Sequence, residues 1–372
     1  MSAQTARPTH SAHPATGAAV VAQPLVARLQ QALERDGASA SGPPAARLRR
    51  LVELGLDALP LPARGATLAR WQALAAVGAS DLSLAKLYEG HTDALAILHE
   101  LWAGQAALEP GLARDVPRLW AVWAAEAPHA RVHLEPDESA ATARISGTKA
   151  WCSGAADVSH ALLTAWAPDA QAPQLVAVAL RQPGVDIDPQ PWQAVGMAAS
   201  ASASVGFHEV PVTLVGAPGA YLQRPGFWQG GAGVAACWHG AAVALAQALQ
   251  RAAQQAADRP QTQFLLAALG RVDVALASTA ALLREGAAWL DTHPAADARL
   301  VALRVRQAVE ACARLVLDET CRALGAAPLC LDAGFARRAA DLPVFIRQSH
   351  GARDDAALGD ALRTLAEPGW LP

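Results

Sequence analysis

The sequence lacks a surplus of charge of either sign and is poor in cysteine. Its 372 residues carry 30 basic and 33 acidic side chains, which gives a net charge of −3. Such a balance provides no long-range attraction to nucleic acid or to an anionic membrane, so neither is expected as a partner. The five cysteines form no CxxC pair, which argues against a disulfide framework or a zinc site. We therefore expect reduced thiols and a cytoplasmic protein.

The sequence also lacks the features of a secretion signal and of a typical membrane span. Residues 1–22 have no charged start followed by an apolar core, and we predict a disordered tail there. We expect only one membrane-like run, residues 230–249, which is built from Ala and Gly and includes His239 and Gln247. A membrane span would contain more large apolar side chains, so this run predicts a buried helix.

The period of the hydrophobic pattern changes twice along the chain. Residues 23–116 have the pattern of short amphipathic helices, residues 117–218 alternate with a period near two, and residues 219–372 return to long helical segments. We therefore predict an α+β multidomain fold. It consists of an N-terminal helical domain, a middle antiparallel β-barrel or sandwich, and a C-terminal four-helix bundle.

The last helix of the first part contains a histidine among its apolar residues. Ser80 or Asp81 is expected to cap its start, and Gly104 is expected to stop it. His91 falls on the apolar stripe of this helix, at helical spacing from Leu84 and Leu95. The spacing predicts an imidazole that faces the interior.

Three segments carry motifs that occur in a fixed order. In the first, ISGTKAWCSGAADVSHALLTAW (145–166), a Gly-x-Lys turn leads to Trp151 and then to Ser153. The second, QPWQAVGMAASASASVGFHEVPV (190–212), has a Trp followed by a Gly and a Ser-rich strand. The third, RALGAAPLCLDAGFARRAADLPVFIRQSH (322–350), combines a Gly-containing loop, a basic patch and a final turn. Taken together, these motifs resemble the acyl-CoA dehydrogenase superfamily over about residues 80–360.

The resemblance implies an FAD-dependent oxidoreductase with a flavin at the first motif. Trp151 would lie against the isoalloxazine ring, and Ser153 would form a hydrogen bond near flavin N5. The alternation of a strand places residues 151 and 153 on one side and Cys152 on the other. The alternative is a tryptophan packed inside a hairpin, with a serine that caps a turn.

The family's catalytic carboxylate is absent from both of its usual places. Residues 348–352 read QSHGA, and residues 221–240 contain no Asp or Glu. His350 is the remaining group that can move a proton, because a histidine works as a base near neutral pH. Monooxygenases of the family resemble this arrangement of His91, Ser153 and His350. The alternative is a core His91 and a helix-capping His350.

The resemblance implies further flavin contacts, although the matching motifs are incomplete. Trp123 occupies the segment VWAAEAP, where the family has an acidic Gly-Ser motif. Arg259 and Gln263 in ADRPQTQF would contact the FAD diphosphate, and Gly325 would allow close approach of its adenine dinucleotide. The alternative for Arg259 is a solvent-facing side chain beside a turn.

Three functions follow from these motifs. The first is oxidation of an acyl thioester such as acyl-CoA, or of a similar small acyl substrate, at flavin N5. The second keeps the flavin and uses O2 as the acceptor, and the third is a non-catalytic subunit or binding protein. The resemblance also implies an electron-transferring flavoprotein or a flavin reductase as redox partner, and a homodimer or homotetramer.

Overall fold

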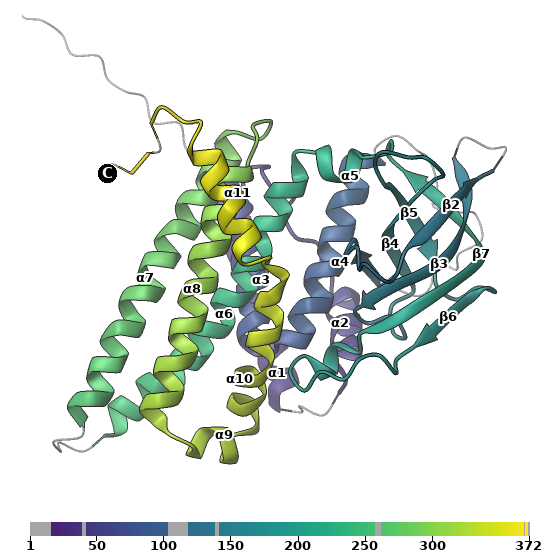
Figure 1. Cartoon of the computed structure of the whole chain (residues 1–372). Coiled ribbons are helices and arrows are strands. Elements are labelled where there is room, and N and C mark those ends of the chain that lie inside the picture. The colour runs from purple at the N-terminus through teal and green to yellow at the C-terminus, as the bar shows by residue number, and fades with distance from the viewer. Residues whose placement is uncertain are drawn as a thin grey trace, which may run out of the picture.

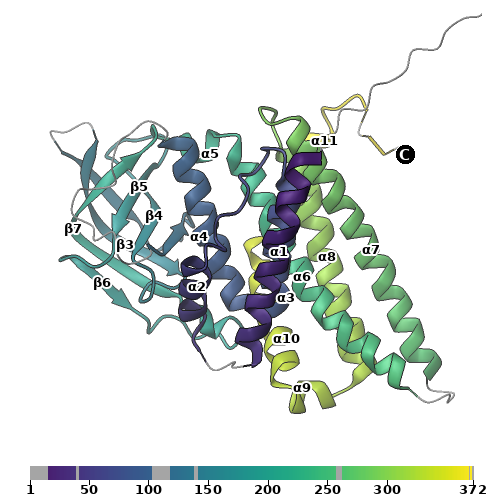
Figure 2. The ribbon, with the colours of Figure 1, turned by 180° about the vertical axis from the view of Figure 1, so that it is seen from behind.

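The computed structural model describes residues 16–38, 42–102, 118–137, 141–256, 262–367 and 369–370. A β-sheet domain and a bundle of long helices lie side by side, and helix α4 runs between them (Figure 1). The same order is seen from behind, where α1 crosses the outer face of the helical part (Figure 2). The two halves therefore meet along α4.

Four helices make up the N-terminal part: α1 (Thr16–Ala38), α2 (Pro44–Glu53), α3 (Thr67–Ser80) and α4 (Leu82–Leu101). The backbone of α1 is already helical within the segment predicted as a tail, because its first residues are rich in alanine, the best helix former. Asp81 caps α4, since its carboxylate accepts a hydrogen bond from the Leu84 N–H. Of the two predicted caps, the structure uses Asp81. The predicted stop at Gly104 lies outside the described residues.

Seven strands form one sheet in the order β1-β4-β5-β7-β3-β2, with β6 paired to β7. Their bounds are β1 Trp120–Trp123, β2 Val132–Pro136, β3 Thr142–Cys152, β4 His160–Ala165, β5 Gln174–Ala179, β6 Val185–Asp188 and β7 Ala203–Val215. A bridge between His133 and Trp166 brings β2 back to the end of β4, which curls the sheet toward a barrel. The prediction of an antiparallel unit is wrong for one pair. β1 and β4 run parallel, which the long connection through β2 and β3 permits.

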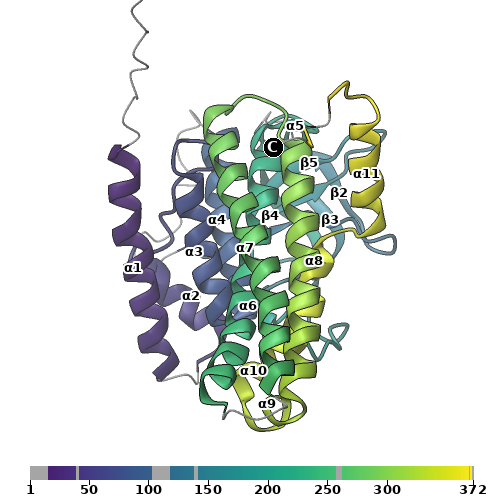
Figure 3. The same cartoon turned by 90° about the vertical axis from the view of Figure 1, so that its left-hand side faces the viewer.

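The C-terminal part contains three long helices, α6 (Gly226–Gln255), α7 (Thr262–Thr292) and α8 (Arg299–Leu324). The short helix α5 (Ala220–Gln223) precedes them. After them come α9 (Ala327–Leu331), α10 (Ala333–Phe345), the 3₁₀ turn η2 (Ile346–Gln348) and α11 (Ala352–Leu362). Helix α10 packs on α6 and α8 as the fourth member of the bundle. Figure 3 shows α6, α7 and α8 side by side.

Glycines let α3 and α6 approach closely. A Cβ atom on Gly240 would lie 2.0 Å from the Ala75 carbonyl oxygen, and one on Gly78 would lie 2.2 Å from the Cys237 carbonyl oxygen. Both positions therefore exclude any side chain. The Ala- and Gly-rich composition of residues 230–249 serves this close packing.

Helices α6 and α7 are both long and apolar enough to cross a membrane by length and composition, but their surroundings differ. The most apolar window of α6 is 72% buried inside the chain, as expected for the core helix predicted at residues 230–249. The corresponding window of α7 is only 17% buried. Phe264, Leu266 and Val274 on α7 are 70%, 52% and 66% exposed. Helix α7 thus presents a long apolar face at the outer edge of the molecule (Figure 1).

Candidate active site

The end of strand β3 displays a large indole ring to solvent. Trp151 is the penultimate residue of β3 and is 54% exposed. The pairing of β3 with β7 is irregular between Lys149 and Cys152, and Trp151 has a φ of +58°. A bulge re-aims the side chain that it carries, so Trp151 turns outward while Cys152 is fully buried. The indole is therefore not enclosed within the hairpin.

A relay of serines orients the hydroxyl of Ser153 beside this ring. The Ser202 hydroxyl donates a hydrogen bond to Ser153 Oγ over 3.2 Å, and Ser202 Oγ lies 3.0 Å from Ser200 Oγ. The backbone of Ser153 is held as well, because the Trp123 indole N–H donates to its carbonyl oxygen. Since Ser153 Oγ accepts from Ser202, its own hydrogen remains available to a ligand. The structure thus brings Trp123 into contact with Ser153, two residues after Trp151.

The backbone around this site is strained at three positions. Trp151, Met197 and Ala201 all have positive φ values, of +58°, +59° and +46°. Met197 and Ala201 flank the 3₁₀ turn η1 (Ala198–Ser200), which bonds to the Ser153 turn through the Gly154 N–H and the Ser200 carbonyl. Such conformations cost about 1–3 kcal/mol each and concentrate at functional sites. Their clustering marks this region as a candidate ligand site.

A buried lysine fixes β3 just before the bulge. Lys149 is 1% exposed, and its ammonium donates to Glu126 Oε1 over 2.9 Å and to Thr164 Oγ1 over 2.8 Å. Partial burial acts to raise the pKa of Glu126, but hydrogen bonds from Thr164 and Lys149 outweigh it and lower the pKa. Glu126 is therefore an ionised partner of Lys149.

The predicted histidine of the final turn has a carboxylate partner. His350 follows η2, and its side chain is 67% exposed. Its backbone N–H donates to Asp354 Oδ2 over 3.1 Å, and its ring Nδ1 lies 3.3 Å from Asp354 Oδ1. An Nδ1–H bonded to Asp354 leaves Nε2 unprotonated and able to accept a proton. Asp354 was missed from the sequence, although its place four residues after His350 in a helix-capping segment was the available signal.

A buried arginine connects this turn to the start of α6. The Arg306 guanidinium donates to the Gln348 carbonyl over 2.7 Å and to the Gly231 carbonyl over 2.8 Å. It also lies over the Trp238 ring and 3.9 Å from Asp354. Gly231 has no heavy atom within 4 Å of where a Cβ would lie, so the helix wall is open there. Arg306 therefore ties the start of α6 to the turn that carries His350.

Helix α10 links the final turn to the serine relay. Asp341 on α10 accepts a hydrogen bond from the Met197 N–H, and the Ala340 carbonyl packs against Gly196. Met197 leads into η1 and so to Ser202. Among the described residues no direct contact joins His350 to Trp151 or Ser153. The two groups are positioned by one continuous set of elements, β3, η1, α10 and η2.

His91 faces the interior, as predicted, but its ring is fully engaged. It is 1% exposed, its Nδ1 accepts a hydrogen bond from the Trp120 N–H, and its Nε2 lies 3.1 Å from Asp57 Oδ2. The backbone donor requires an unprotonated Nδ1, which assigns the hydrogen to Nε2. This arrangement corresponds to the structural alternative, in which His91 joins α4 to the start of β1.

The residues predicted to bind the FAD diphosphate and dinucleotide are far from Trp151 in the sequence. Arg259 is outside the described residues. Gln263 is exposed in the first turn of α7, and Gly325 ends α8 with a φ of +68° and open space around it. The start of α7 and the end of α8 lie at the same end of the bundle (Figures 1 and 3). Among the described residues, no contact of Gln263 or Gly325 indicates that either one binds a ligand.

The fold has well-defined relatives among solved structures. No family model and no curated protein sequence matches the chain. TdsC from Paenibacillus sp. A11-2, solved with FMN and indole, is 21% identical and matches over 92% of this chain and 96% of its own, with a TM-score of 0.68. KijD3, solved with FMN and a dTDP-sugar, is 21% identical over 94% of each chain, with a TM-score of 0.74.

The dehydrogenases match the backbone more closely at lower identity. Butyryl-CoA dehydrogenase from Megasphaera elsdenii is 15% identical and matches over 92% of this chain and 98% of its own, with a TM-score of 0.78. The chain therefore has the acyl-CoA dehydrogenase fold, and the predicted fold class is confirmed.

The donor set at the Trp151 turn fits a flat, hydrogen-bonding ligand such as a flavin. An exposed indole supplies a planar apolar face, and Ser153 supplies a hydroxyl hydrogen that its neighbours leave free. Rigid backbone on both sides holds the two groups in place. The residues present are thus compatible with an isoalloxazine ring.

The Glu126–Lys149 pair predicts an acid-sensitive fold. Because the folded-state pKa of Glu126 lies below its ordinary value of 4.5, its contribution is fully present above that value. The contribution is lost as the pH falls through the folded-state pKa. We expect the free energy of unfolding of Glu126→Gln to be lower than that of the native protein at about pH 6, and this difference to shrink toward about pH 3.

Urea denaturation at several pH values measures this difference. Glu135→Gln on β2, where the side chain is exposed, is the control and should follow the native protein throughout. A difference in the free energy of unfolding between Glu126→Gln and the native protein that stays constant with pH would contradict the lowered pKa of Glu126.

Proposed function

We propose that this protein is a flavin-dependent oxidoreductase that acts on a small-molecule substrate. The observation that carries the proposal is the exposed Trp151 indole on a strained backbone, with the oriented Ser153 hydroxyl beside it. A large exposed indole costs hydration free energy unless a ligand covers it. Strain of this kind is retained where a ligand requires the geometry.

Trp151 and Ser153 would hold the reactive ring of the cofactor. A bound flavin would supply the acceptance or donation of two electrons at its central ring. Trp151 would pack on one face of that ring, and Ser153 would donate its hydrogen at the ring edge. FAD is the cofactor that the sequence resemblance implies, whereas TdsC and KijD3 were solved with FMN. Both cofactors contain the ring that these residues fit.

His350, with Asp354, is the group that we assign to proton transfer. Asp354 holds the imidazole through Nδ1, which directs the basic Nε2 away from the turn. The side chain is exposed and so accessible to substrate. This is a neutral base, unlike the carboxylate of the acyl-CoA dehydrogenases.

Because the family's carboxylate is absent from both of its usual places, we favour oxygen as the electron acceptor, with a flavin reductase as partner. TdsC, which has the same fold, is named a dibenzothiophene monooxygenase. The second candidate is oxidation of an acyl thioester with an electron-transferring flavoprotein, because the butyryl-CoA and glutaryl-CoA dehydrogenases share the fold with TM-scores of 0.78 and 0.76. Loss of flavin absorbance when acyl-CoA thioesters are added without oxygen would select the second candidate. Oxygen uptake that depends on a flavin reductase would select the first.

Removal of Trp151 should weaken flavin binding. We expect FMN and FAD to quench the tryptophan fluorescence of the native protein, and Trp151→Ala to bind both about tenfold more weakly, from loss of one aromatic contact. Trp370→Ala is the matched control, because Trp370 is 77% exposed near the C-terminus. A native protein that neither carries nor binds flavin would instead support the non-catalytic reading.

Removal of His350 should leave the fold and the flavin affinity intact and lower turnover. We expect about a hundredfold loss for His350→Ala, the usual contribution of a positioned base. Asp354→Asn should lower turnover when His350 is present and have no additional effect in the double variant, because it acts through that ring. Steady-state kinetics of the native protein, the two single variants and the double variant completes this double-mutant cycle. Additive losses would show that the two residues act separately.

We also propose that the apolar face of α7 is covered by a second copy of this chain, as the sequence resemblance implies. Val274→Glu should shift the protein toward monomer, because an interface core disfavours a buried charge. Leu331→Glu is the control, since Leu331 on α9 is 86% exposed. Light scattering coupled to size exclusion gives the masses. A monomeric native protein would contradict the proposal, and its adsorption to lipid vesicles would identify a membrane as the covering surface.

A further inference from the structure

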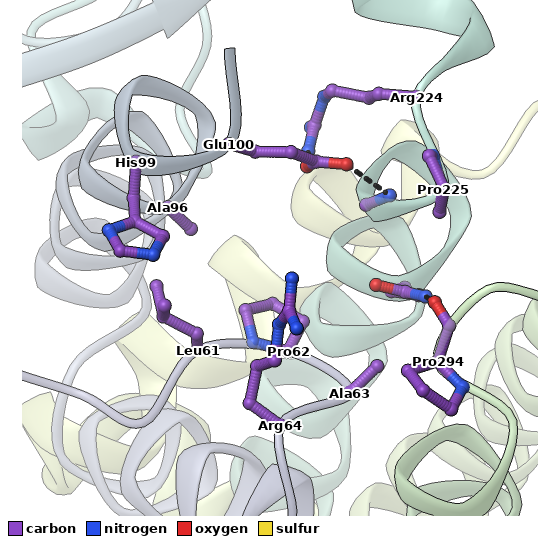
Figure 4. Close-up of a pocket in the computed structure, with 12 residues that line it drawn as sticks. Leu61, Pro62, Ala63, Arg64, Ala96, His99, Glu100, Arg224, Pro225 and Pro294 are labelled. Carbon is purple, nitrogen blue, oxygen red and sulfur yellow. Dashed lines mark hydrogen bonds and ion pairs between the residues drawn. The ribbon is translucent and has the colours of Figure 1, made fainter. Parts of the chain in front are cut away.

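A cavity lies between the end of α4 and the start of α6, and none of the residues discussed so far lines it. Its volume is about 260 Å³. Three segments enclose it: the loop 61–64, the last turns of α4, and the start of α6, with Pro294 closing one side (Figure 4). Leu61, Pro62, Ala96, Pro225 and Pro294 give it apolar walls.

Two basic side chains reach this cavity without a partner. Arg64 extends from the loop toward the cavity, and His99 projects from α4 (Figure 4). Within the part of the chain that the structure describes, neither side chain has a hydrogen bond or an ion pair. Both are therefore free to bind a ligand from solvent.

The only described carboxylate in the lining is already neutralised. Glu100 Oε2 pairs with Arg224 Nη1 over 2.7 Å, and its Oε1 accepts a hydrogen bond from the Gly226 N–H over 3.1 Å. Arg224 is 8% exposed, and its Nε is buried without a partner. The guanidinium groups of Arg64 and Arg224 and the carboxylate of Glu100 together leave one net positive charge. The N-terminal end of α6 contributes additional partial positive charge.

The loop that carries Arg64 is rigid. Asp291 on α7 accepts hydrogen bonds from the Gly65 N–H and from the Thr67 N–H, and the Ala63 N–H donates to Thr67 Oγ1. Ala63 is 3% exposed and has a φ of +55°. The loop is thus held on both sides of Arg64, so that ligand binding would order little more than the Arg64 side chain.

We propose that this cavity binds a small monocarboxylate with an apolar body. The carboxylate would bind Arg64 and His99, and the body would lie against the proline and alanine walls. The single net positive charge matches a monoanion, whereas a dianion such as phosphate would leave one negative charge in the cavity uncompensated. The volume is below that of a pocket for a drug-sized ligand, which limits the body to about the size of one ring.

Calorimetric titration of the full-length protein with benzoate tests the proposal. We expect saturable binding at one site, and affinities for benzylamine and for inorganic phosphate at least about tenfold weaker. Arg64→Gln and His99→Gln should each weaken benzoate about tenfold or more, because each removes a charge-assisted hydrogen bond. Arg49→Gln on α2 is the matched control, since Arg49 is also exposed and has no described partner.

Trp151→Ala separates this cavity from the proposed flavin site. It should bind benzoate as the native protein does, with or without FMN present. Equal binding of benzylamine or phosphate, unchanged affinity in Arg64→Gln, or loss of benzoate binding in Trp151→Ala would each overturn the proposal. Absence of saturable benzoate binding would overturn it as well.

Discussion

The buried ammonium of Lys149 is the constraint on which the candidate site depends. It lies two residues before Trp151 on β3 and is bound by Glu126, which follows β1, and by Thr164 on β4, so three segments are joined at one point. A charge with 1% exposure must keep its partners, because an unpaired ammonium in the interior is costly. The bulge that turns Trp151 outward therefore follows a rigid anchor. Without that anchor, a left-handed backbone at a bulky residue would relax into ordinary strand geometry.

The rest of the site is assembled from segments that are distant in sequence. Ser153 is oriented by Ser202, the η1 turn is held by Asp341, and the His350 turn is held by Arg306. Each of these contacts uses a buried or half-buried polar group with a defined partner. Trp151 and His350 thus belong to one framework, although no direct contact between described residues joins them.

The sequence was sufficient for the regular elements and for the residues at the end of β3. The period of the hydrophobic pattern predicted the helical parts at both ends of the chain and the strand-rich part between them. It does not define every strand, because four-residue strands such as β1 and β6 are too short to show a period. The inward direction of His91 followed from helical spacing, but its partners did not. Asp57 lies 34 residues away and the Trp120 N–H lies 29 residues away, and only the folded chain brings them together.

Helix α6 shows why the chain is so rich in small residues. Its glycines have opposite surroundings: Gly240 lies against the backbone of α3, whereas Gly231 faces open space next to the His350 turn. The absence of a side chain at Gly240 lets two helices pack at minimal separation. Near Gly231, Arg306 binds the Gly231 carbonyl and the Gln348 carbonyl together, which ties α6 to the turn that carries His350. The same helix thus supplies the core of the bundle and an anchor for that turn.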